Sequence, residues 1–186
     1  MASAIFTVAN QLTLLRMVFI PFFLLSIWES HYGWALAIFI IAGLTDTLDG
    51  VLARWLQQKT SLGAYLDPIA DKLLLSSSFF VLALKGDVRW WLTILVLGRD
   101  VLIITIAVVL IVATGRRPFP PSIYGKACTV AQVLAVFLVL LTRVRSRPFF
   151  EMAEVAAIYL AAALTLISGL HYAITYSRHI VEAERG

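Results

Sequence analysis

The chain has few charged residues, a single cysteine and no basic segment ahead of its first apolar run. Of its 186 residues, 14% are charged and 61% are hydrophobic, and the mean hydropathy is +0.91, which excludes an ordinary soluble or disordered domain. Because Cys128 is alone, no intrachain disulfide can form. The missing basic region argues against a cleaved signal peptide. The Lys and Arg residues form no stripe interleaved with aromatics, so we expect no nucleic acid partner.

Six apolar segments fill most of the sequence, and each is close to the length of about 20 residues that spans a bilayer. They run approximately from Leu12 to Trp28, Trp34 to Leu56, Ala64 to Leu84, Trp90 to Ala113, Ile123 to Leu141, and Met152 to Tyr176. The segments predict an all-α, multi-pass integral membrane protein with six transmembrane helices in one bundle, formed by a single domain over residues 1–186. The net charge of +4 suits contact with anionic membrane lipids.

Four aspartates stand out in this apolar background: Asp46, Asp49, Asp67 and Asp71. A carboxylate inside a bilayer costs roughly 2.5–3.5 kcal/mol on insertion scales, so four of them require a compensating role. Spacings of three and four residues place both members of each pair on one face of a helix. Two facing helices would then present four carboxylates, which is a ligand set suited to Mg²⁺ or Mn²⁺.

The aspartates belong to an unbroken pattern, D-x2-D-G-x2-A-R-x8-G-x3-D-x3-D, from Asp46 to Asp71. This pattern resembles the signature of the CDP-alcohol phosphatidyltransferase family. The resemblance implies transfer of a phosphatidyl group from a CDP-linked lipid to an alcohol, with release of CMP. It also implies a six-helix membrane protein, usually a homodimer, with its active site open to the cytoplasm, and it implies Asp46, Asp49 and Asp67 as metal ligands.

The chemistry accounts for the residue types in this signature. Two divalent ions held by shared carboxylates can clamp the attacking and leaving oxygens of a displacement at phosphorus. Asp71 is expected to contact a metal ion and to accept the proton of the acceptor alcohol. The CDP-lipid, CDP-diacylglycerol, is expected to contact the other signature residues, which are Gly50, Ala53, Arg54 and Gly63. Taken singly, the small residues serve helix packing equally well, and the arginine suits an interfacial anchor.

Two further stretches are similar to the phosphatidylglycerophosphate synthases and cardiolipin synthases of this family. One is N-x-L-T-x-x-R from Asn10 to Arg16, and the other is G-K-x-x-T-x-x-Q from Gly125 to Gln132. The sequence Gly98-Arg99-Asp100 stands where Arg-Glu is more usual in the phosphatidylglycerophosphate synthases. This difference favours the cardiolipin synthases. By itself, Arg99-Asp100 reads equally well as a buried ion pair or as part of the site.

The acceptor is expected to be anionic and phosphorylated. Three cations that suit it are predicted on the side of the aspartates: Arg116, Arg117 and Lys126. Glycerol 3-phosphate is therefore the predicted acceptor, and phosphatidylglycerol, which would make the chain a cardiolipin synthase, is the alternative. By position alone, the three cations also read as ordinary positive-inside residues.

The distribution of Lys and Arg over the loops places the amino terminus and the active site on the cytoplasmic side, in a bacterial inner membrane or an organelle membrane. The cluster of Arg143, Arg145 and Arg147 on the other side argues against this orientation.

Two other functions use intramembrane aspartates. A UbiA-type prenyltransferase also binds a diphosphate with Mg²⁺, but those chains are longer and carry two motifs far apart. A divalent-cation channel or transporter would use the carboxylates as a transport site, although no internal repeat is present here.

Overall fold

A computed structural model of the chain describes residues 8–55, 61–114 and 122–183, with side chains for 14–45, 70–106, 108–109 and 122–175. Within these ranges every regular element is an α-helix. The helices are α1 (Val8–Trp28), α2 (Tyr32–Trp55), α3 (Ser61–Leu84), α4 (Trp90–Thr114), α5 (Ile123–Val144) and α6 (Pro148–Ala183). The predicted all-α fold is confirmed for the described ranges, whereas a single domain over residues 1–186 stays a prediction.

The helix ends follow the apolar segments closely, with one exception. α3 ends at Leu84 and α4 begins at Trp90, as the segments predict. α6 begins at Pro148 and runs to Ala183, past both ends of its predicted segment. Proline suits the first helical position because its φ is fixed near the helical value. It lacks a backbone N–H, but an N–H at this position would have no acceptor within the helix. The far end of α6 is polar, so hydropathy alone could not detect it.

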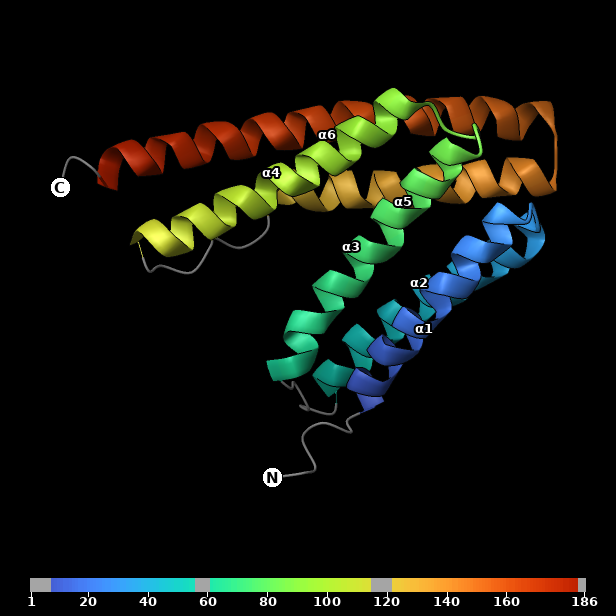
Figure 1. Ribbon diagram of the computed structural model, residues 1–186, viewed down its shortest axis with the longest axis horizontal. Helices are drawn as coiled ribbons and strands as arrows, with labels where there is room; N and C mark the ends of the chain where they lie inside the picture. The colour runs from blue at the N-terminus through green and yellow to red at the C-terminus, as the bar shows by residue number, and fades with distance from the viewer. Residues whose placement is uncertain (1–7, 56–60, 115–121, 184–186) are drawn as a thin grey trace.

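The helices pack as two antiparallel hairpins, with α3 and α4 beside them (Figure 1). α1 contacts α2, and α5 contacts α6, while α3 contacts α1, α4 and α5. The end of α2 and the beginning of α3 lie at the same end of the molecule as the beginning of α1 (Figure 1). This arrangement brings the two halves of the aspartate signature to one end.

The interior of the bundle is apolar and closely packed. Phe23 of α1 stacks on Phe39 of α2 with ring centroids 5.7 Å apart, and Phe79, Leu92 and Leu140 are fully buried. Such buried contacts stabilise the bundle and set the distances between its helices.

Much of the outward surface is apolar as well. Val18, Phe22 and Leu25 follow one another on one face of α1, and each is more than half exposed. Among the described residues, Ile123–Val144 and Pro148–Thr175 are long and apolar enough to cross a bilayer, and Leu14–Trp28 and Tyr32–Thr45 are shorter apolar stretches. The structure therefore identifies two candidate membrane spans and does not by itself establish six.

A polar cluster lies at the end of α3 away from the aspartates. It links residues at or next to the α1–α2, α3–α4 and α5–α6 connections. Tyr32 donates a hydrogen bond of 2.6 Å from its hydroxyl to Asp87 Oδ2. Arg143 Nε donates to Asp87 Oδ1 at 2.7 Å, and the Arg143 guanidinium also lies 3.8 Å from Glu154. Arg143 is thus paired within the protein although it is exposed, and Arg145, two residues further along the chain, is exposed as well.

Replacing Asp87 with Asn is expected to destabilise the protein, because it removes the charged acceptor shared by Tyr32 and Arg143. Hydrogen bonds to charged groups contribute about 1.5–3 kcal/mol each, so the thermal midpoint should fall by several degrees. The activity of the folded protein should be retained, since thirteen helical residues, roughly 20 Å, separate Asp71 from the end of α3. Thermal unfolding beside an activity assay tests this, and an unchanged midpoint would contradict it.

Candidate functional site

The four aspartates lie on two helices that follow one another in the chain. Asp46 and Asp49 are in the second half of α2, and Asp67 and Asp71 are in the first half of α3. The predicted placement of both pairs on helices is therefore correct. The side chains of Asp46, Asp49 and Asp67 lie outside the described ones, so the convergence of all four carboxylates stays a prediction.

The other signature residues also lie on these helices. Gly50, Ala53 and Arg54 are in the last two turns of α2, and Gly63 is in the first turn of α3. Their side chains and surroundings are outside the described part of the structure, so their contacts with a CDP-lipid stay predictions.

Asp71 is paired with an arginine from another helix. Arg16 Nη1 of α1 donates a hydrogen bond to Asp71 Oδ1, and the two side chains form an ion pair. Arg16 is almost completely buried, whereas the Asp71 side chain is 43% exposed. A buried guanidinium needs a countercharge, and Asp71 supplies one while keeping an accessible side. The sequence analysis assigned Arg16 to a family-like stretch but did not predict this partner.

A pocket of about 130 Å³ lies beside this ion pair. Its walls come from α1, α2, α3 and α5 and are mostly apolar, with the lining formed by Arg16, Phe39, Ala42, Gly43, Asp71, Leu74, Leu75, Thr129 and Val133. Ala42 and Gly43 lie one turn before Asp46 on α2. The pocket is thus adjacent to the aspartate segments and combines one ion pair with apolar walls, as a site for an amphipathic molecule requires.

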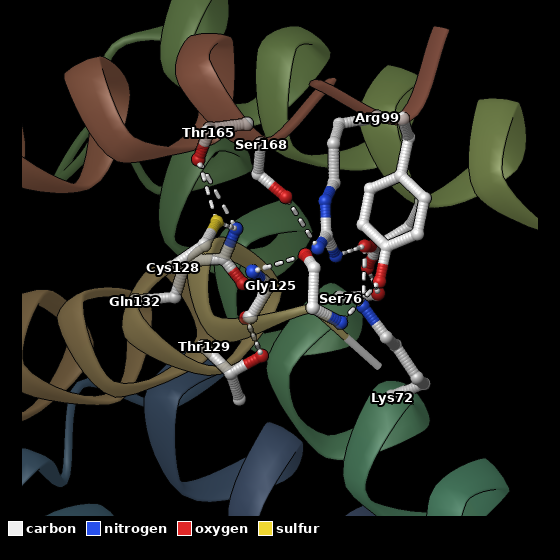
Figure 2. A network of polar contacts seen from close by, with 12 residues as sticks. Lys72, Ser76, Arg99, Gly125, Cys128, Thr129, Gln132, Thr165 and Ser168 are labelled. Atoms are coloured by element: carbon white, nitrogen blue, oxygen red, sulfur yellow. Dashed lines mark hydrogen bonds and ion pairs between the residues drawn. The ribbon is translucent and has the colours of Figure 1, made fainter. Parts of the chain in front are cut away.

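A second charged cluster joins α3 to α4 (Figure 2). Arg99 Nη1 donates to Asp100 Oδ1 at 2.8 Å, and both side chains are buried. Lys72, which follows Asp71 in α3, also pairs with Asp100 Oδ1. The ion-pair interpretation of Arg99-Asp100 is therefore correct, and Lys72 is an additional partner that the sequence analysis missed.

The start of α5 is held by its own polar contacts. Ser122 caps the helix, with its side chain accepting a hydrogen bond of 3.1 Å from the Gly125 N–H. Gln132 is buried and donates from Nε2 to Thr165 of α6 at 3.2 Å (Figure 2). These residues of the G-K-x-x-T-x-x-Q stretch therefore have structural roles.

The three predicted acceptor residues differ in how far the structure places them. Lys126 is exposed near the beginning of α5. Arg116 and Arg117 lie outside the described residues. The role of all three stays a prediction.

The residue types of the signature fit Mg²⁺ or Mn²⁺. Carboxylate oxygens are the ligands that these hard cations prefer, and the four aspartates lie on two helices, α2 and α3, that follow one another in the chain. Among the described side chains, which include only one of the four aspartates, no group of three or more His, Cys, Asp or Glu residues comes together. The donor chemistry of the signature therefore suits these ions.

Comparison with known proteins shows the family of the chain. A model of the CDP-alcohol phosphatidyltransferase family matches residues 6–167. A Mycobacterium tuberculosis protein named "Probable phosphatidylglycerophosphate synthase" is 38% identical over 181 residues, covering 92% of this chain and 82% of that protein. A Haemophilus influenzae protein named "CDP-diacylglycerol--glycerol-3-phosphate 3-phosphatidyltransferase" is 35% identical over 173 residues, covering 90% of this chain and 91% of that protein.

A Mycobacterium bovis protein that carries a cardiolipin synthase name is 36% identical over 126 residues, covering 67% of this chain and 60% of that protein. The family match includes the whole aspartate signature and extends from α1 into α6. The resemblance read from the signature is thereby confirmed, and the chain belongs to the CDP-alcohol phosphatidyltransferase family.

Proposed function

We propose that this chain transfers the phosphatidyl group of CDP-diacylglycerol to glycerol 3-phosphate and releases CMP. The observation that carries the proposal is the unbroken signature from Asp46 to Asp71, placed on the adjoining segments of α2 and α3. The names of the relatives from M. tuberculosis and H. influenzae support glycerol 3-phosphate as the acceptor.

Phosphatidylglycerol is the alternative acceptor, and it would make the chain a cardiolipin synthase. Two observations favour it: a relative named for that activity, and the sequence Gly98-Arg99-Asp100 in α4. The longer matches carry the other name, so we retain glycerol 3-phosphate as the first choice.

The protein is proposed to cross the membrane six times, with its active site facing the cytoplasm, and to form a homodimer. The exposed apolar face of α1 supports a lipid environment, because a water-facing helix would carry polar residues there. The two candidate spans found among the described residues, in α5 and α6, support at least an α5–α6 hairpin in the bilayer. The excess of Lys and Arg over the loops on one side supports the orientation.

Two Mg²⁺ or Mn²⁺ ions are proposed to be held by Asp46, Asp49, Asp67 and Asp71. When bound, such ions would neutralise the diphosphate of the CDP-lipid and stabilise the attacking and leaving oxygens. Ions are needed because four carboxylates would otherwise repel an anionic substrate.

Asp71 is proposed as the residue that accepts the proton of the acceptor hydroxyl. The hydroxyl oxygen forms a bond to the phosphorus that carries the diacylglycerol, the bond from this phosphorus to the CMP oxygen breaks, and CMP leaves. A carboxylate has about four acceptor sites, so the hydrogen bond from Arg16 leaves room for a proton. The partial exposure of Asp71 beside the pocket supports this role.

The remaining residues are proposed to bind the substrates. Gly50, Ala53, Arg54 and Gly63 would contact the CDP-lipid, with the small residues letting its nucleotide approach the helix backbone. Arg116, Arg117 and Lys126 would neutralise the phosphate of the acceptor.

Supplying each acceptor separately tests the proposed reaction. Purified protein with CDP-diacylglycerol and glycerol 3-phosphate is expected to give phosphatidylglycerophosphate, with one CMP released per product. The mass of the product distinguishes the two acceptors, because phosphatidylglycerol would give a four-chain lipid. A four-chain product without turnover of glycerol 3-phosphate would overturn the acceptor and leave the reaction class intact. Divalent-cation flux into liposomes without CMP release would instead favour a transport protein.

A further inference from the structure

The cluster around Asp100 contains buried charges that the proposed reaction does not use. Its carboxylate pairs with Lys72 of α3 and with Arg99 of its own helix, and Ser76 of α3 lies within 3.4 Å of Asp100 Oδ2. Asp100 and Arg99 are both less than a tenth exposed. Because charges are costly inside a bilayer, such a cluster needs a function.

The position of Lys72 links this cluster to the site. Lys72 follows Asp71 directly, and consecutive helical residues point roughly 100° apart around the helix axis. Asp71 pairs with Arg16 of α1, while Lys72 pairs with Asp100 of α4. The same turn of α3 is thus tied to two different helices, which fixes both its rotation and its height in the bundle.

Asp100 is itself held in place from several directions. Arg99 Nη1 donates to it, and Arg99 Nη2 donates to Ser168 of α6 at 2.9 Å (Figure 2). The Arg99 guanidinium lies 5.9 Å from the ring centroid of Tyr172, also in α6. A Cβ atom added at Gly125 of α5 would lie 3.4 Å from Arg99 Nη2, so α5 packs closely against this group as well.

We propose that Asp100 is a positioning residue: anchored by Arg99, it holds Lys72 and so sets the turn of α3 that carries Asp71. This inference rests on the proposed function, because its effect on the reaction is exerted through Asp71. Asp100 touches no reacting atom in this assignment.

Neutralising either partner should reduce turnover more than substrate binding. In the purified full-length chain, Asp100→Asn and Lys72→Met are each expected to lower kcat at least tenfold, with KM for both substrates within about threefold. The kcat of the double variant should be no lower than that of the more impaired single variant, because residues that act as a unit have non-additive effects. Asp100→Glu and Lys72→Arg, which keep the charges, should recover part of the lost rate.

Asp87→Asn is the matched control, since it makes the same substitution in an ion pair at the connection between α3 and α4, away from Asp71. Its folded protein should keep the wild-type kcat. If Asp100→Asn fails to fold, Lys72→Met still decides the question, because the Lys72 side chain is 40% exposed and its loss leaves no large buried gap.

Wild-type kcat in Lys72→Met, or losses that multiply in the double variant, would overturn the positioning role. A raised KM for one substrate with unchanged kcat would also overturn it and make Asp100 a substrate contact.

If the wild type turns over no acceptor, the proposed function fails, and the affinity for Mn²⁺ alone, measured by electron paramagnetic resonance, becomes the test. Affinity weakened at least threefold in Lys72→Met, but not in Asp87→Asn, would support the positioning role, and equal affinity in all three proteins would overturn it.

Discussion

Asp71→Asn is expected to lower kcat by about 10²–10⁴-fold, the usual loss when a general base is removed. The amide keeps the size of the side chain and an oxygen that can accept the hydrogen bond from Arg16. Because it removes the countercharge of the buried Arg16 guanidinium, the thermal midpoint should fall as well, so kcat is compared on folded protein. What is lost is the capacity to accept the proton of the acceptor hydroxyl. Affinity for CDP-diacylglycerol should therefore change much less than turnover, and both quantities should be measured on the same preparation.

The corresponding changes at the other aspartates provide the comparison. Asp46→Asn, Asp49→Asn and Asp67→Asn should weaken metal and CDP-lipid binding together with turnover, because these residues are proposed as metal ligands. An Asp71→Asn variant with the wild-type rate would remove Asp71 from the base role. A variant that lost affinity as severely as the other three would make Asp71 mainly a metal ligand.

Removal of divalent cations is expected to abolish nearly all activity. Without cations, the anionic diphosphate of the substrate would face carboxylates that repel it, and the leaving oxygen of CMP would carry uncompensated charge. Activity in excess chelator should be close to background and should return when Mg²⁺ or Mn²⁺ is added in excess. Recovery on addition serves as the control for folding, and full turnover in the chelator would contradict the two-ion proposal.

The elements that carry the site could be predicted from local sequence signals. The apolar segments ending at Leu84 and beginning at Trp90 match the end of α3 and the beginning of α4, because the sequence changes there between apolar and polar residues. The placement of Asp46 and Asp71 on helices followed from the same runs. α6 extends further than predicted, since its polar end at Ala183 leaves no hydropathy signal.

The partners of the charged residues could not be predicted in the same way. Arg16 pairs with Asp71, 55 residues away, and Lys72 pairs with Asp100, 28 residues away. Which side chains meet at such separations depends on the rotation and packing of helices, and the local pattern does not determine either. One signal was available, because a charged residue inside an apolar segment generally requires a partner of opposite charge.

The proposed acceptor-binding residues have no distinguishing local pattern in the sequence. Lys126 is exposed at the beginning of α5, and Arg116 and Arg117 lie outside the described residues. Cationic residues near the end of an apolar segment serve equally well as orientation signals and as phosphate ligands. Their assignment therefore depends on the acceptor test.

Release of CMP by the wild-type chain and by Asp49→Asn, compared side by side, tests the central claim most directly. The assay contains CDP-diacylglycerol, glycerol 3-phosphate and Mg²⁺, with a parallel reaction that lacks the acceptor. The account predicts acceptor-dependent release by the wild type, in a one-to-one ratio with phosphatidylglycerophosphate, and almost none by a folded Asp49→Asn variant. CMP release by Asp49→Asn at the wild-type rate, or no release by the wild type with either acceptor, would contradict phosphatidyl transfer at the aspartate signature.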